Sequence, residues 1–133
     1  MAQRFMHESP YRDQLGESVD TAKAFILSLI DSPIHSVLVY EDKLGSVQGV
    51  FALYVFDHYY SGERMAGELI WYVEPEARKG FRALELLRAA EKEAKKAGAK
   101  RMQLVAPTEE IGKIYMRCGG YQKIEVTYQR TLQ

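Results

Sequence analysis

Apolar residues recur at helical spacing in three segments of the chain. The first segment follows Ser18 and Asp20, either of which can cap a helix N-terminus, and it ends before Pro33. The second spans residues 81–97, and the third spans residues 108–119. The pattern therefore predicts three helices. The apolar stripe of the first consists of Ala22, Phe25, Ile26, Leu29 and Ile30.

Strand periodicity separates these helices. Three strands that can pair as a meander are expected between the first two helices, a fourth between the second and third, and a fifth at the end of the chain. In the last segment Ile124, Val126 and Tyr128 alternate with polar residues. The order predicts an α/β fold with a mixed, mostly antiparallel central sheet and helices on both faces. The first four strands are expected at residues 35–41, 50–56, 67–73 and 101–105.

The composition is typical of one ordinary globular domain spanning residues 1–133. Hydrophobic residues make up 47% of the chain and charged residues 27%, which excludes global disorder. No apolar run approaches the ~20 residues needed to cross a bilayer, and the N-terminus lacks a secretory pattern, so we expect a cytoplasmic protein without a membrane partner. A single cysteine, Cys118, and three scattered histidines predict neither a disulfide nor a metal site.

The zero net charge hides an asymmetry between the two halves of the chain. Residues 1–73 contain ten acidic and five basic residues, whereas residues 74–133 contain eight acidic and thirteen basic ones. One interpretation is an anionic ligand on the basic half and a cationic ligand on the acidic half. The alternative is that these charges lie on solvated surfaces. Nucleic-acid binding is not favoured, because there is no excess of positive charge.

The junction between the third strand and the second helix is the most informative segment. Residues 74–81 form a short loop that contains Arg78, Lys79 and Gly80 and leads directly into the helix, where Arg82 follows. Unpaired N–H groups and a partial positive charge at a helix N-terminus can bind an anion, and the basic side chains would add full charges. The alternative is an exposed loop whose charges interact with solvent.

This junction resembles motif A of the GNAT family of acetyl-CoA-dependent N-acetyltransferases, Arg/Gln-x-x-Gly-x-Gly/Ala. Arg78 takes the first position and Ala83 the last, whereas Phe81 replaces the fourth-position glycine, which lies one residue earlier at Gly80. The resemblance implies a GNAT-like fold with acetyl-CoA as co-substrate. It assigns the pyrophosphate to residues 78–83, namely Arg78, Lys79, Gly80, Phe81, Arg82 and Ala83, and the pantetheine arm to the backbone of Trp71, Tyr72 and Val73.

The resemblance also points to two catalytic residues. Glu68, on the third strand, occupies a region where the family sometimes has a glutamate that serves as a base, and a carboxylate inside an apolar strand needs a role or a partner. Near the end of the third helix, Tyr115 is similar to the family tyrosine that protonates the CoA thiolate if Gly119 is the family glycine. If Gly120 and Tyr121 are the Gly–aromatic pair, that position falls on Met116.

These residues predict transfer of an acetyl group to a primary amine by direct attack in a ternary complex. The acceptor is either a small-molecule amine or an amine of a peptide or protein. A competing prediction is a catalytically silent GNAT-like module that binds CoA or a protein partner. Homodimerisation is expected from base rates alone. Gly62 and Gly67 have phosphate-loop spacing, but Glu68 stands where the lysine is required, which excludes a nucleotide-hydrolysing site.

Overall fold

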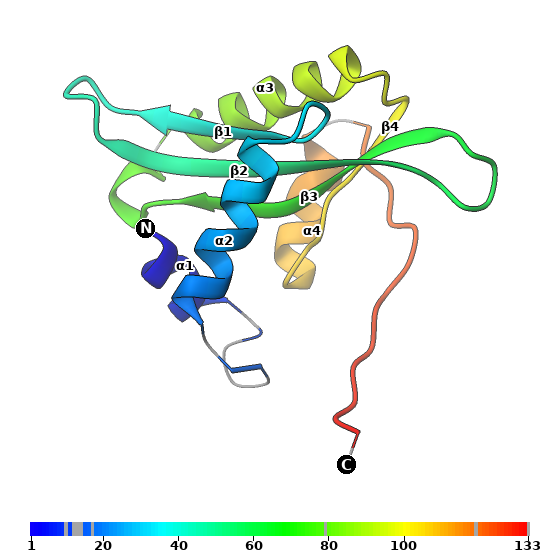
Figure 1. Ribbon diagram of the computed structural model, residues 1–133, viewed down its shortest axis with the longest axis horizontal. Helices are drawn as coiled ribbons and strands as arrows, with labels where there is room; N and C mark the ends of the chain where they lie inside the picture. Colours follow the sequence, from blue (N-terminus) through cyan, green and yellow to red (C-terminus); the bar gives the residue numbers. More distant parts are fainter. Residues whose placement is uncertain (10, 12–14, 17, 79, 119, 133) are drawn as a thin grey trace.

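The computed structural model describes residues 1–9, 11, 15, 16, 18–78, 80–118 and 120–132. One four-stranded sheet has the order β1-β2-β3-β4 (Figure 1). Strands β1 and β2 pair antiparallel, as do β2 and β3, whereas β3 and β4 pair parallel. The predicted mixed, mostly antiparallel sheet is therefore confirmed. The strands are β1 (Ser36–Glu41), β2 (Val47–Asp57), β3 (Arg64–Val73) and β4 (Arg101–Gln103).

Helices cover both faces of the sheet (Figure 1). Helix α2 (Val19–Ile30) crosses one face and α1 (Ala2–Glu8) precedes it, while α3 (Arg82–Lys96) lies on the other. Helix α4 (Glu109–Arg117) is on the α3 side, where Arg88 of α3 donates to the Cys118 carbonyl at 2.5 Å. The Ser18 side chain caps α2, which decides between the two candidates Ser18 and Asp20, and the Thr108 side chain caps α4, where the last helix was expected to begin.

The core lies between β2 and α3. Phe51, Leu53 and Val55 alternate along β2 and point to the helix, where Leu87 and Ala90 are fully buried. Burying a side chain such as Leu87 contributes roughly 1.5–3 kcal/mol. This contact fixes the start of α3 relative to the end of β3, and so positions the junction singled out in the sequence.

The predicted C-terminal strand does not form. Among the described residues, 121–132 make no strand or helix, and Figure 1 shows this segment running away from the sheet. Alternation predicts where side chains would point in a strand, but a strand exists only when its backbone finds a partner. Helix α1 was not anticipated, because seven residues are too few to show a clear helical period.

A short 3-10 turn, Pro75–Ala77, joins β3 to the segment before α3. Within the described part of the chain, no helix combines the length and apolar character needed to span a membrane.

Candidate active site at the separation of two parallel strands

The pairing of β3 with β4 ends at Gly67 and Gln103. Just beyond that point, an Oε2 atom of Glu68 accepts a hydrogen bond from the Val105 N–H at 2.9 Å. The hydroxyl of Tyr115, on α4, donates to the Val105 carbonyl, also at 2.9 Å. The two side chains that the sequence proposed as catalytic, 47 positions apart, are thus brought to the same residue at the place where the strands separate.

A β-bulge in β3 places Glu68 for this contact. Ala52 lies opposite Ile70 and Leu53 opposite Glu68, so Leu69 is an additional residue in β3. A bulge changes which residues share a face of the strand, and bulges are frequent beside active sites. Here Glu68 accepts its hydrogen bond from Val105, in the segment before α4, and Trp71, three residues further on, stacks on Tyr115 of α4 with ring centroids 5.7 Å apart. Sequence spacing alone would place Glu68 and Trp71 on opposite faces.

The surroundings of Glu68 make it a poor acid and a suitable base near neutral pH. Burial raises the pKa of Glu68 to about 7, and the hydrogen bond from the Val105 N–H opposes this shift. Desolvation disfavours the charged carboxylate, because it loses water that a single N–H group does not replace. A carboxyl group with a pKa near the working pH can accept a proton and release it again.

Tyr115 complements Glu68, because it keeps its proton and can donate it. Burial, and next the nearby negative charge of Glu68, raise the pKa of Tyr115 above the ordinary value for a phenol. The hydroxyl therefore keeps its proton and can act as a donor. Of the two positions left open by the sequence, Tyr115 is half-buried beside Trp71 and Met116 is 49% exposed.

The N-terminus of α3 has the features of an anion site. Its capping residue, Phe81, provides no side-chain hydrogen bond to the first turn. Within the described residues, no hydrogen bond engages the backbone N–H groups of Ala83 and Leu84. Gly80 precedes this turn with φ +78°, a left-handed conformation that favours glycine, which explains why the loop has its glycine at 80 and not at 81.

Arg78 is held by the protein itself. Its Nε donates to the Val73 carbonyl at 2.7 Å, its Nη2 pairs with Glu8 at 2.7 Å, and its guanidinium lies over the Tyr72 ring. The hydrogen bond from Arg78 lowers the pKa of Glu8, which favours the charged form of this carboxylate. Glu8 comes from α1, 70 positions away, and no sequence spacing would have revealed it. Lys79, also proposed for the phosphate, lies outside the described residues.

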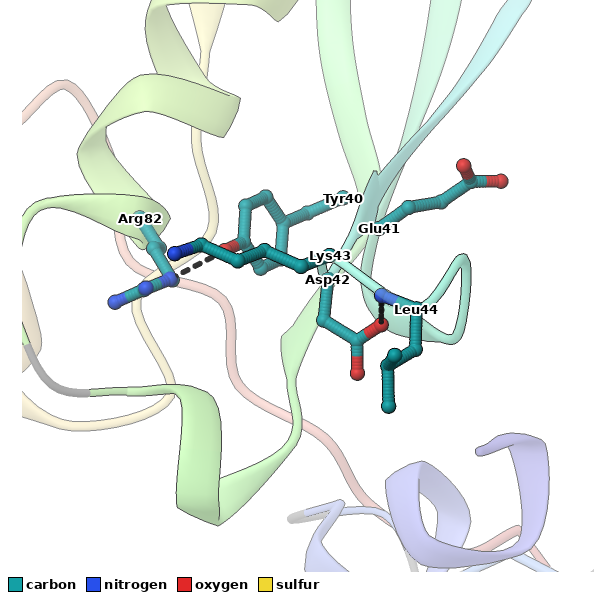
Figure 2. Close-up of a pocket in the computed structure, with 6 residues that line it drawn as sticks. All are labelled: Tyr40, Glu41, Asp42, Lys43, Leu44 and Arg82. Atoms are coloured by element: carbon teal, nitrogen blue, oxygen red, sulfur yellow. Dashed lines mark hydrogen bonds between the residues drawn. The ribbon is translucent and has the colours of Figure 1, made fainter.

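Arg82 borders a groove of about 460 Å³ between α3 and the β1–β2 hairpin (Figure 2). Its Nε donates to the Tyr40 hydroxyl, and its guanidinium lies 5.5 Å from the centre of the Tyr40 ring. Figure 2 shows the Lys43 ammonium end turned toward Arg82. The sequence did not point to Tyr40 or Lys43, because Tyr40 falls within the strand expected at residues 35–41 and Lys43 lies just after it.

Trp71, Tyr72 and Val73 form the end of β3 between these two regions. Their side chains are occupied by the protein: Trp71 packs on Phe51 and Tyr115, Tyr72 donates to Glu8 at 3.1 Å, and Val73 is in the core. This is compatible with a role for the backbone of residues 71–73. Among the described residues, no three His, Cys, Asp or Glu side chains are grouped as metal ligands would be.

The chain therefore combines parallel strands that separate after Gly67 and Gln103, a bulge in β3 and a helix without a side-chain cap after the junction. The model of the acetyltransferase (GNAT) family matches residues 3–119. The chain therefore belongs to the GNAT acetyltransferase family.

Solved structures show the same fold. A putative acetyl transferase from Pyrococcus furiosus has a TM-score of 0.75 at 16% identity, with 98% of this chain and 91% of that chain covered. Aminoglycoside 6'-N-acetyltransferase AAC(6')-Ih from Acinetobacter baumannii has a TM-score of 0.72 at 16% identity, covering 88% and 83%. AAC(6')-Iy, in complex with a bisubstrate analogue, CoA-S-monomethyl-acetylneamine, has a TM-score of 0.73 at 15% identity, covering 98% and 91%. No curated protein sequence matches this chain.

Proposed function

We propose that residues 1–133 act as a single N-acetyltransferase domain that transfers the acetyl group of acetyl-CoA to a primary amine. Family membership implies the use of acetyl-CoA. The observation that carries the proposal is the convergence of Glu68 and Tyr115 on Val105 where β3 and β4 separate. One of these groups is suited to accept a proton and the other to donate one, which are the two tasks that aminolysis of a thioester requires.

The residues present fit the co-substrate. The N–H groups of Ala83 and Leu84, which have no hydrogen-bond partner among the described residues, and the positive end of α3 would receive the diphosphate, with Arg82 adding charge beside them. The pantetheine arm would follow the backbone of residues 71–73 toward Glu68. Among the side chains assigned to the loop, Arg78 contributes least to this proposal, since Glu8 and the Val73 carbonyl already engage it.

The proton balance assigns a role to each catalytic residue. A primary amine is mostly protonated at neutral pH, its pKa being about 10. The ammonium group loses two protons in the reaction. Glu68 takes the first and passes it to solvent, which frees the nitrogen lone pair for attack on the thioester carbonyl. As the C–S bond breaks, Tyr115 gives its proton to sulfur and is reprotonated by the second proton from nitrogen. The products are an amide and free CoA.

The acceptor is proposed at the level of a chemical class. Several structural neighbours, AAC(6')-Ih among them, are named as aminoglycoside acetyltransferases, so polyamine-like small molecules are the first acceptors to test. Lysine side chains or N-termini of peptides present the same nucleophile and form the second panel. Direct attack in a ternary complex needs no covalent enzyme intermediate, and neither Glu68 nor Tyr115 is assigned as a nucleophile.

Thermal unfolding with CoA or acetyl-CoA, followed by thiol release, tests the proposal. A ligand that binds only the folded state raises Tm through RT ln(1 + [L]/Kd). We expect a higher Tm with both ligands and thiol release that depends on an added amine. No change in Tm at millimolar CoA would contradict the proposal. A raised Tm without thiol release across both acceptor panels would favour the silent binding module instead.

A further inference from the structure

Helix α4 carries the proposed acid but is only shallowly packed. None of its nine residues, all of which the structure describes, is fully buried. The chain directly after it is tied to α3 by the hydrogen bond from Arg88 to the Cys118 carbonyl. A helix with few buried contacts can shift on its neighbours at a low free-energy cost. The place of the Tyr115 hydroxyl therefore depends on what holds the Tyr115 side chain itself.

The Tyr115 side chain is held both at its hydroxyl and at its ring. The hydroxyl donates to the Val105 carbonyl at 2.9 Å, and the ring stacks on Trp71 with an angle of 18° between the planes. The Tyr121 ring is also near, with centroids 6.4 Å apart, but it is inclined by 52°. When the hydroxyl gives its proton to sulfur it releases the Val105 carbonyl, whereas the stack on Trp71 can stay in place.

Trp71 is fixed by the sheet. It lies on β3 opposite Phe51 of β2, and the two rings are 5.6 Å apart. Phe51 is fully buried and belongs to the core. Aromatic pairs prefer defined arrangements of their rings. The stack therefore ties a side chain of the shallowly packed α4 to the best-packed part of the sheet.

The Tyr115 proton can turn from the Val105 carbonyl to a sulfur atom without movement of the ring. Rotation about the C–O bond redirects the O–H group, while Oη keeps its place. Proton transfer requires donor and acceptor within hydrogen-bond reach, and a displacement of about 1 Å can lower a rate about a hundredfold. The orientation of the Tyr115 ring therefore decides whether the hydroxyl can protonate the thiolate.

We propose that the Trp71 side chain is a positioning residue for acetyl transfer, which holds the Tyr115 hydroxyl in place when this hydroxyl releases the Val105 carbonyl. The inference rests on the proposed function, and in particular on Tyr115 as the acid. It gives the Trp71 side chain a role separate from that of its backbone, which is assigned to the pantetheine arm. Loss of the indole leaves the phenol present but misplaced.

Tryptophan fluorescence tests the stack without turnover. Trp71 is the single tryptophan of the sequence, so the emission reports this site alone. We expect Tyr115→Leu, which removes the ring, to shift the emission maximum to longer wavelength, because the indole gains contact with water. Tyr115→Phe keeps the ring and should leave the maximum unchanged. An unchanged maximum in Tyr115→Leu would contradict the positioning role, whether or not the chain transfers acetyl groups.

A double-mutant cycle tests whether Trp71 acts through Tyr115. Trp71→Leu should lower kcat about thirtyfold with the Kd for CoA within about twofold, and Trp71→Phe, which keeps a ring, should restore kcat to within about threefold of the unaltered chain. Tyr115→Phe should lower kcat about a hundredfold in the unaltered chain and about threefold in Trp71→Leu. The full loss in both backgrounds, or unchanged kcat in Trp71→Leu, would overturn the proposal.

Val55→Ala is the control for lost packing. Val55 lies on β2 in the core and is 3% exposed, so this variant should lower Tm and leave kcat within about twofold. If its kcat fell as far as that of Trp71→Leu, the effect of Trp71 would be a general loss of packing and the proposal would be wrong. Absence of thiol release from the unaltered chain would instead contradict the proposed function, and the emission of Tyr115→Leu would still decide on the stack.

Discussion

The two ends of the proposed acetyl-CoA site are built from different chemistry. At the separation of β3 and β4, the groups are half-buried side chains whose charge can change or is absent: Glu68 with its pKa raised to about 7, and Tyr115, which keeps its proton. At the start of α3, they are backbone N–H groups with exposed arginines around them. Proton transfer needs a group whose charge can change, whereas holding a diphosphate needs fixed donors. We therefore expect substitutions in the first region to affect turnover and those in the second to affect binding.

The largest effect is expected from Glu68→Gln. The amide keeps an acceptor for the Val105 N–H but cannot take a proton, so kcat/KM should fall about a thousandfold while CoA affinity stays within about twofold. Glu110→Gln, in the exposed first turn of α4, is the matched control and should leave both unchanged. Steady-state kinetics and calorimetry measure the two quantities. If Glu68→Gln lowered CoA affinity and left turnover unchanged, the assignment of turnover to the first region and binding to the second would be wrong.

The pKa of Glu68 also predicts two pH dependences. Because the base works only when deprotonated, kcat/KM should rise with pH up to about 7 and then level off, and the Gln variant should lack this rise. Stability should change in the opposite direction. The folded state holds the proton more tightly than the unfolded state, so the free energy of unfolding decreases as pH rises from about 4.5 to about 7, by at most about 3 kcal/mol. Denaturation at pH 5 and 8 should show that decrease in the unaltered protein and not in Glu68→Gln.

Tyr115→Phe should have the next largest effect. It keeps the ring stacked on Trp71 but removes the proton donor, so kcat should fall about a hundredfold with little change in KM. Tyr121→Phe is the control, because it removes a hydroxyl that is bonded to Glu91, and its kcat should remain within about twofold. Acceptors with equal kcat in Tyr115→Phe and the unaltered enzyme would exclude Tyr115 as the acid.

Gly80→Ala tests the binding region. Alanine at φ +78° costs roughly 1–2 kcal/mol, and relaxation of the loop would move the first N–H groups of α3. The Kd for CoA should rise about tenfold. Gly62→Ala, at φ +74° in the β2–β3 hairpin with open space around it, should lower stability to a similar degree and leave the Kd unchanged. Equal Kd values for the two variants would mean that the loop does not shape the CoA site.

The smallest effect is expected from Arg78→Gln. The exposed Arg78–Glu8 pair contributes at most about 1 kcal/mol, and Arg78 faces α1, so CoA affinity should change less than about fivefold. Glu8→Gln sharpens the comparison. If Arg78 turns to the diphosphate when CoA binds, removing the Glu8 charge should tighten CoA binding. Isothermal titration of both variants therefore distinguishes an Arg78 that stays paired with α1 from one that binds the diphosphate.

The sequence predicted the parts of the fold that depend on local signals. The Ser18 cap, the stripe of α3 and the end of that helix before Gly98 all follow from spacing along the chain, and each is confirmed. The C-terminal strand failed because a strand also needs a distant partner, which alternation at Ile124 and Val126 does not provide.

The same limit applies to the candidate site. Glu68 and Tyr115 could be proposed from residue type and family resemblance, but their meeting at Val105 depends on the bulge at Leu69 and on the docking of α4, which no local pattern reveals. The charge asymmetry of the two halves stays a prediction. Within residues 1–73, three acidic side chains are paired with arginines: Glu8, Asp57 and Glu63.

Backbone NMR of the ¹⁵N-labelled chain tests the diphosphate site most directly. CoA should shift the N–H resonances of Phe81, Ala83 and Leu84, and pantetheine, which lacks the diphosphate, should leave them in place while shifting residues 71–73. The predicted result is that these three resonances shift with CoA and do not shift with pantetheine. Saturation with CoA that leaves all three unchanged would contradict the assignment of the α3 N-terminus to the diphosphate.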